Sequence, residues 1–129
     1  MNKKTLLTII SILVLPVLAF WGISLSKGTS VAASASGLPQ VIKFSSSMCL
    51  ECKQIEGIFD EIMPKYANRV EYKKVIVDSR KDMKNPLIKH YKVTLVPTVV
   101  MVNSDGSTAQ KIVGAVSKEQ YEECIKGLK

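Results

Sequence analysis

A long uncharged stretch near the N-terminus limits which structures this chain can adopt. From Thr5 to Ser26 there are 22 residues without a charge, and most of them are large and apolar. A helix of this length is about 33 Å long, which matches the roughly 30 Å hydrocarbon core of a bilayer. Lys3 and Lys4 precede the stretch, so the N-terminus is expected to stay inside and the rest of the chain to face outward. We therefore expect residues 1–26 to be a transmembrane or signal segment.

Two kinds of export segment fit this stretch. A cleaved signal peptide has an apolar region of about 7–15 residues that is followed closely by a small-residue cleavage site. The motif Ala33-Ser34-Ala35 has the form of such a site, but it lies well beyond the apolar end at Leu25. The length favours an uncleaved anchor, and a cleaved signal peptide is the alternative. Both place the following domain outside the cytoplasm, either membrane-anchored or secreted.

The residues after this stretch divide into a linker and one domain. Residues 27–37 are small and polar without a periodic pattern, as in flexible linkers. Residues 38–129 are enough for one domain and too few for two. Without the three lysines that flank the apolar stretch, 15 of the 18 basic residues remain against 11 acidic ones, a net charge of +4. Basic and acidic residues are interspersed, so we expect a solvated surface and no nucleic-acid binding.

Strand patterns and helical patterns alternate within residues 38–129. Apolar residues at helical spacing run from Cys49 to about Met63, where Pro64 is expected to end the helix. The segment Asn103-Ser104-Asp105-Gly106 is a turn signal between the last two expected strands. Ser117 and Gln120 form a capping box at the start of the last helix. The expected strands lie at 41–44, 70–77, 98–102 and 110–113, and the expected helices at 49–63, 87–91 and 117–128. The order βαβαββα predicts an α/β fold with a central mixed sheet and helices on both faces.

Cys49 and Cys52 stand where the first of these strands leads into the first of these helices. Residues three apart in a helix share one face, and the free N–H groups of the first turn favour a thiolate at Cys49. A thiolate attacks a disulfide, and a second thiol within reach can resolve the mixed disulfide that forms. Zinc and copper also bind cysteines at this spacing, so a metal-binding module is the alternative. Two inert buried cysteines are less expected at such a junction.

Pro97 directly precedes the apolar strand at 98–102. A central strand rejects proline, because proline has no N–H to donate to the sheet. We therefore expect Pro97 at the start of the strand or in a special backbone geometry.

Together these motifs resemble the thioredoxin family over residues 40–128. The stretch KFSSSMCLECKQIEGIFDEI is similar to the family's strand, active-site loop and following helix. The segment Val96-Pro97-Thr98 resembles the family's approach to a cis-proline, and residues 113–118 resemble the entry to its last helix. The usual first strand and helix are absent, so the resemblance implies the minimal core of a thioredoxin-like fold.

The resemblance also implies a function. It indicates an extracytoplasmic protein thiol–disulfide oxidoreductase in which Cys49 is the nucleophile and Cys52 resolves. Val96 and Pro97 would shape the groove for an extended protein substrate. The resemblance favours reduction of protein disulfides, with electrons from a membrane thiol donor, and it implies no cofactor and no metal. A non-catalytic adhesion or chaperone domain is a third class, and the intact cysteine pair argues against it.

Several residues differ from the family's usual pattern. Met48 replaces the tryptophan before the first cysteine, and Leu50-Glu51 replaces the usual Gly-Pro. The buried acid of thioredoxins, which is thought to pass a proton to the resolving cysteine, is replaced by Lys43. We expect the Lys43 amine to reach water, because a buried unpaired lysine is costly.

Two further residues have candidate roles. Cys124 is expected on the inner face of the last helix, where simple core packing is favoured over a regulatory thiol. His90 is the single histidine and is expected at the surface, since no partner ligand lies at metal-site spacing.

Overall fold

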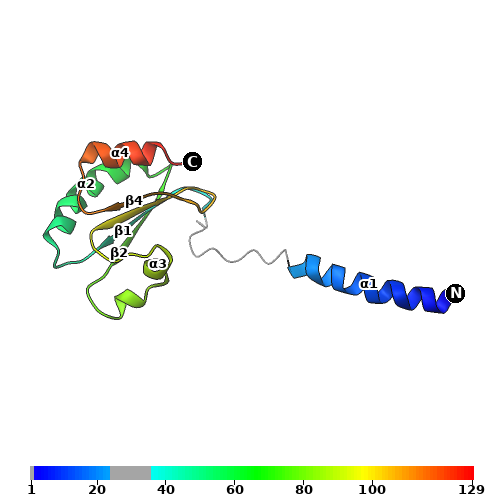
Figure 1. The fold of residues 1–129 in the computed structure, drawn as a ribbon. Helices are drawn as coiled ribbons and strands as arrows, with labels where there is room; N and C mark the ends of the chain where they lie inside the picture. The colour runs from blue at the N-terminus through cyan, green and yellow to red at the C-terminus, as the bar shows by residue number, and fades with distance from the viewer. Residues whose placement is uncertain (1, 24–35) are drawn as a thin grey trace. The chain divides into compact units, whose positions relative to one another are not determined.

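The computed structural model describes residues 2–23 and 36–129 (Figure 1). Helix α1 (Lys3–Ile23) and the domain that follows belong to separate units. Within the described residues, no helix combines the length and the apolar character needed to cross a membrane. The linker expected at 27–37 lies almost entirely outside the described residues, as do the last three residues of the expected anchor.

The domain has the order of elements that the sequence predicts, with one additional 3-10 turn. The elements are β1 (Gln40–Ser45), α2 (Leu50–Tyr66), β2 (Glu71–Ile76), η1 (Asp82–Lys84), α3 (Pro86–His90), β3 (Thr98–Val102), β4 (Thr108–Val113) and α4 (Lys118–Lys126). Leaving η1 aside, this is the predicted βαβαββα order.

The strands form a four-stranded mixed sheet in the order β2-β1-β3-β4. Strand β1 pairs in parallel with β2, whereas β3 is antiparallel to both β1 and β4. The C-terminal ends of β1 and β2 therefore lie at the same edge of the sheet as the N-terminal end of β3. The register agrees, because Ser45 is opposite Ile76 and Phe44 is opposite Thr98. The loops that leave or enter these three ends are thus neighbours.

Alternate residues of β1 and β3 fill two hydrophobic cores, one on each face of the sheet. On one face, Val41 and Val99 pack against the apolar sides of α2 and α4. On the other face, Ile42 and Val100 pack against α3. Figure 1 shows α2 and α4 together on one side of the sheet and α3 on the other. The predicted α/β fold with helices on both faces is confirmed.

The boundary of the long helix differs from the sequence prediction. Helix α2 continues past Pro64 to Tyr66, although Pro64 was expected to end it. Proline in a helix removes the hydrogen bond to the carbonyl four residues earlier. Only a short final turn depends on that bond here, and Tyr66 packs against the core while its carbonyl accepts the Arg69 and Val70 N–H groups. Tertiary packing therefore outweighs the local cost of the proline.

Two local signals behave as the sequence predicts. The turn between β3 and β4 closes with the Gly106 N–H donating to the Asn103 carbonyl at 2.9 Å, and Gly106 has a φ of +87°, which favours glycine. Ser117 caps α4, where its hydroxyl accepts the Gln120 N–H and the Gln120 side chain accepts the Ser117 N–H. The predicted capping box is confirmed.

Candidate active site

Cys49 and Cys52 form a disulfide at the start of α2, with their Cα atoms 5.2 Å apart. Cys49 is the N-cap of the helix, and its Sγ accepts the Cys52 N–H at 3.2 Å. The two cysteines differ in exposure, because Cys49 is half-buried whereas Cys52 is only 3% exposed. The cysteine whose sulfur accepts the helix N–H is therefore also the more exposed of the two.

The loop that carries Cys49 is bonded to the end of β2. The Asp78 Oδ1 atom accepts the Ser46 hydroxyl and the Ser47 N–H, each at 2.8 Å. The Ser46 hydroxyl oxygen in turn accepts the Met48 N–H at 3.3 Å. The Ser47 and Ser46 hydrogen bonds hold the pKa of Asp78 below its usual value, so the carboxylate form is favoured. This contact was not anticipated from the sequence, because it depends on the parallel pairing of β1 and β2.

A cis peptide bond joins Val96 and Pro97 immediately before β3. The segment is fixed on both sides, since the Thr98 hydroxyl donates to the Leu95 carbonyl at 2.7 Å and the Gly114 N–H donates to the Pro97 carbonyl at 2.8 Å. Pro97 thus lies at the strand start with a special geometry, as expected. The N-terminal end of β3 lies at the same sheet edge as the loop after β1, so Pro97 and Cys49 belong to the same end of the domain.

The thioredoxin family model matches residues 29–127 of the chain. The chain belongs to the thioredoxin family. It is 28% identical over 88 residues to a thioredoxin of Borreliella burgdorferi, which covers 68% of this chain and 71% of that protein. It is 30% identical over 87 residues to a thioredoxin of Staphylococcus aureus, covering 67% of this chain and 78% of that protein.

The fold comparison agrees with the sequence comparison. The crystal structure of oxidized thioredoxin O2 from Arabidopsis thaliana aligns with a TM-score of 0.63 and 25% sequence identity, over 77% of this chain and 82% of that chain. Thioredoxins are thiol–disulfide oxidoreductases, and this chain has the paired cysteines that the reaction uses. The chain is therefore a thiol–disulfide oxidoreductase of the thioredoxin family.

Lys43 lies in the interior of the domain, so the expectation that its amine reaches water is wrong. Its side chain is 1% exposed, and Nζ lies 3.9 Å from the Glu56 Oε1 atom and 5.6 Å from the centroid of the Phe59 ring. Strand β1 is flanked by strands on both sides and covered by α2, so the Lys43 side chain is enclosed. Glu56 supplies the counter-charge and also pairs with Lys74.

The environment of Lys43 affects its protonation. Burial lowers the pKa of Lys43 below 10.5, repulsion from Lys74 lowers it further, and the Asp60 carboxylate partly opposes both. Glu56 lies four residues after Cys52, on the same face of α2. The sequence could have suggested Glu56 through this spacing, but its contact with Lys43 required the packing of α2 on β1.

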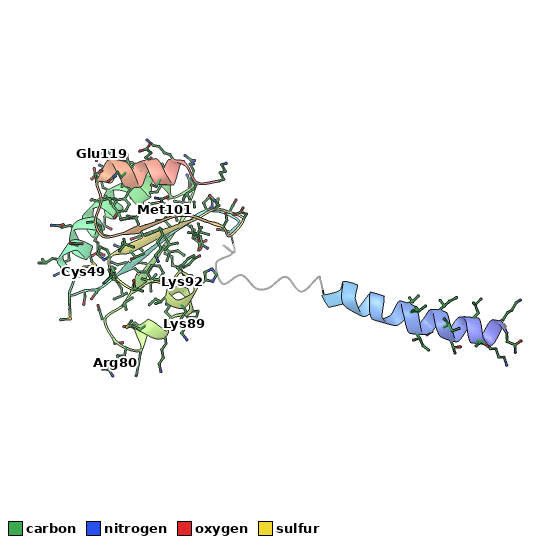
Figure 2. All side chains as sticks on the ribbon, in the orientation of Figure 1. Cys49, Arg80, Lys89, Lys92, Met101 and Glu119 are labelled. Carbon is green, nitrogen blue, oxygen red and sulfur yellow. A yellow bond between two sulfur atoms is a disulfide. The ribbon has the colours of Figure 1, made fainter. Side chains whose placement is uncertain are left out.

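Large exposed apolar side chains flank Cys49 in sequence and precede the cis peptide bond. Met48 is 89% exposed, Leu50 is 79% exposed and Leu95 is 64% exposed. Figure 2 shows Cys49 at one end of the domain, at the start of α2. Apolar side chains left in water beside a reactive centre are typical of a surface that contacts other proteins.

Cys124 and His90 have ordinary surroundings. Cys124 is a free, half-buried thiol that packs against the core between α2, α4 and the sheet. His90 is exposed at the end of α3. Among the residues at 2–23 and 36–129, no three or more histidine, cysteine or acidic side chains gather as a metal site would require.

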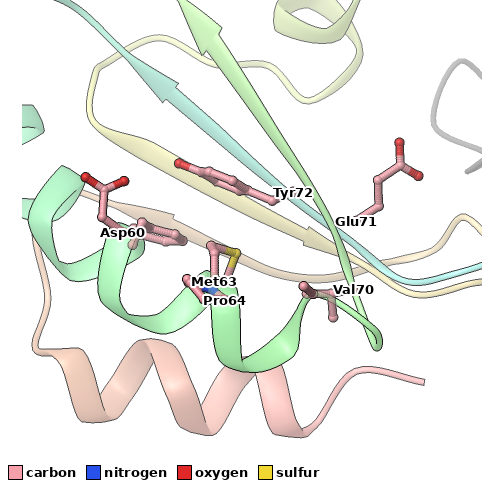
Figure 3. Close-up of a pocket in the computed structure, with 8 residues that line it drawn as sticks. Asp60, Met63, Pro64, Val70, Glu71 and Tyr72 are labelled. Carbon is pink, nitrogen blue, oxygen red and sulfur yellow. The ribbon is translucent and has the colours of Figure 1, made fainter.

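A cavity of about 500 Å³ lies away from the cysteines (Figure 3). Asp60, Met63 and Pro64 line it from α2, and Tyr72 lines it from the start of β2. Burial, together with the Asp60 carboxylate, raises the pKa of Tyr72 to about 12. The start of β2 is at the sheet edge opposite to the loop that carries Cys49, so this cavity is not part of the active site.

Proposed function

We propose that this chain is a membrane-tethered, extracytoplasmic protein thiol–disulfide oxidoreductase in which Cys49 attacks and Cys52 resolves. The observation that carries the assignment of roles is the difference between the two cysteines. Cys49 is half-buried and its Sγ accepts a helix N–H, whereas Cys52 is 3% exposed. Helix N–H groups stabilise a thiolate, and burial raises the pKa of a thiol.

The proposed reaction has two steps, starting from the reduced protein. The Cys49 thiolate attacks one sulfur of a substrate disulfide, so a mixed disulfide forms and the other substrate sulfur leaves as a thiolate. The Cys52 thiol then loses its proton and attacks the Cys49 Sγ. This step releases the second substrate thiolate and forms the Cys49–Cys52 disulfide. Two electrons thereby pass to the substrate, and a dithiol donor must return them.

The groove for the substrate backbone is proposed at Val96. This residue is half-buried, and among the described residues nothing hydrogen-bonds to its N–H or its carbonyl. A peptide group without a hydrogen-bond partner can pair with an extended segment of another protein. Pro97 has no N–H of its own and fixes the direction of this segment.

Reduction of substrates is the proposed direction, with a membrane thiol carrier as electron donor. The support for this direction is the family resemblance. The reduction potential of the Cys49–Cys52 couple tests it: a value near thioredoxin's roughly −270 mV supports a reductant, and a value near −120 mV identifies an oxidant instead.

Trapping of mixed disulfides tests the roles of the two cysteines. Cys52→Ser keeps the attacking thiol and removes the resolving one, so in cells it should accumulate covalent adducts that disappear on reduction. Cys49→Ser should give almost none, and Cys124→Ser should behave like the natural protein. The measurement is a non-reducing gel after acid quenching. Equal trapping by Cys49→Ser and Cys52→Ser would show that the roles are assigned wrongly.

A further inference from the structure

A second, smaller cavity opens beside the cis peptide bond. Its volume is about 180 Å³, and most of its lining is apolar. The apolar lining residues are Val77, Met83, Ile88, Val93, Leu95 and Val96. They come from the segment after β2, from η1, from α3 and from the approach to β3. We call this cavity the Met83 pocket.

The Met83 pocket lies at the same sheet edge as the cysteines. Val77 directly follows β2, and its N–H donates to the Ser45 carbonyl at 2.8 Å, at the point where β1 leads into the Cys49 loop. Val96 both lines the pocket and contributes to the cis peptide bond. The pocket is therefore continuous with the surface at which a substrate backbone is proposed to pair.

The size of the Met83 pocket decides what it can hold. Sites for small-molecule ligands usually enclose about 300–1,000 Å³, so about 180 Å³ is too small for a typical one. It is enough for one large apolar side chain. Met83 is 55% exposed and Leu95 is 64% exposed, so a side chain entering the pocket would cover apolar surface that now faces water.

Basic residues lie close in sequence to the residues that line the Met83 pocket. Arg80, Lys81, Lys84, Lys89 and Lys92 are all exposed. None of these five side chains has an ion-pair partner within the described part of the chain. Figure 2 shows Arg80, Lys89 and Lys92 together on the side of the domain that carries α3.

The neighbouring acids do not balance this charge fully. The Asp82 carboxylate accepts the Ser79 N–H at 2.8 Å and the Asp78 N–H at 3.1 Å, and Asp78 is bonded to the Cys49 loop. Both carboxylates are therefore already engaged within the domain. The region from 79 to 92 presents five basic residues and one acid to a partner.

We propose that the Met83 pocket is a specificity pocket that binds one large apolar side chain of a substrate protein whose neighbouring residues are acidic. The proposal rests on the thiol–disulfide exchange function and adds a substrate class to it. Side chains of an extended segment alternate in direction, so pairing at Val96 would direct every second side chain toward the same side. Carboxylates beside the apolar residue would meet the lysines and speed the encounter.

Exchange rates of the reduced full-length chain with three disulfides test this inference. Two are synthetic nonapeptides with one central cysteine joined to 2-mercaptoethanol. The acidic peptide has a leucine two residues before and two residues after the cysteine, and glutamate at its other positions. The basic peptide has serine in place of each leucine and lysine in place of each glutamate. The third is bis(2-hydroxyethyl) disulfide, which is uncharged. For each variant, the rate with each peptide is divided by the rate with this disulfide. The natural protein should prefer the acidic peptide by about tenfold.

Variants separate the two parts of the recognition. Met83→Ser should lower the preference for the acidic peptide, because leucine loses a contact, and Lys81→Glu combined with Lys84→Glu should shift the preference toward the basic peptide. Lys126→Glu, a charge reversal of an exposed lysine on α4, is the matched control and should keep the natural preference. Equal rates of the natural protein with both peptides would contradict the proposed pocket. So would a preference that is unchanged in Met83→Ser and in the Lys81→Glu and Lys84→Glu double variant. Failure to exchange with all three disulfides would overturn the proposed function as well.

Discussion

The buried ammonium of Lys43 lies 3.9 Å from the carboxylate of Glu56. Glu56 is one helical turn beyond Cys52 in α2. A buried charge is costly unless a counter-charge is near, and replacing a buried pair by an apolar residue is often neutral or stabilising. We therefore expect substitution of Lys43 and substitution of Glu56 to have different effects on the free energy of unfolding.

Lys43→Met should leave the free energy of unfolding unchanged or raise it by about 1 kcal/mol, because methionine fills the site without a charge. Glu56→Gln should lower it by about 1–2 kcal/mol, because the buried cation loses its partner. The effect is smaller than for a fully buried pair, since Glu56 is 38% exposed. Urea denaturation of both variants measures the difference. A larger loss for Lys43→Met than for Glu56→Gln would contradict this account.

The same lysine should give the stability a distinct dependence on alkaline pH. The folded-state pKa of Lys43 is below 10.5, so the unfolded state binds more protons between the two values. The free energy of unfolding of the natural protein should therefore rise, relative to that of Lys43→Met, as pH approaches 10.5. Tyr72, whose pKa is raised, acts in the opposite direction in both proteins and largely cancels in the difference. A difference that stays flat from about pH 8 to 10.5 would contradict the burial of the charge.

Asp78 should support the exchange rate by holding the Cys49 loop. Asp78→Asn weakens the bonds to Ser46 and Ser47, and we expect the rate with a peptide disulfide to fall about tenfold, since a 1 Å displacement of a reacting group can cost about 100-fold. Asp105→Asn is the control, because Asp105 bonds a serine in the turn between β3 and β4, at the opposite sheet edge. Stopped-flow kinetics should show no loss for that control.

The hydrogen bonds to Asp78 also predict that stability falls at acid pH. They lower its folded-state pKa below 3.8, so the stabilisation they give is complete above that value and is lost as pH falls through the folded pKa.

Two glycines should respond to alanine in opposite directions. Gly57 lies inside α2 with open space where the methyl group of an alanine would lie, so Gly57→Ala should raise the free energy of unfolding by about 0.5–1 kcal/mol. Gly114 also has open space, but its φ is +87°, so Gly114→Ala should lower it by about 1 kcal/mol. Thermal or urea unfolding of the two variants measures this contrast. The same sign for both would show that backbone conformation does not control the outcome.

Membrane attachment is the remaining prediction. The uncharged stretch from Thr5 to Ser26 continues beyond α1 into residues outside the described part of the chain. We expect the full-length chain to sediment with membranes and to resist extraction by high salt and by alkali. Recovery of a soluble chain that begins near Ser36 would show a cleaved signal peptide instead.

The sequence alone predicted the order of elements because that order follows from local patterns. Apolar spacing distinguished α2 from the strands, the Ser117 capping box marked the start of α4, and Gly106 marked the turn before β4. The position of Cys49 at a strand-to-helix junction followed from the same patterns. The end of α2 did not, because tertiary packing carries the helix past Pro64.

Tertiary structure alone decided the surroundings of the cysteines. The parallel pairing of β1 with β2 brings Asp78 to the Cys49 loop, although 29 positions separate Asp78 from Cys49 in the sequence. The packing of α2 on β1 encloses Lys43 and gives it Glu56, where local reasoning expected an amine in water. The Met83 pocket likewise needs the segment after β2, η1, α3 and the approach to β3 to meet. Local patterns determine which element a residue joins, whereas contacts between distant side chains depend on strand register and helix packing, which no short stretch of sequence specifies.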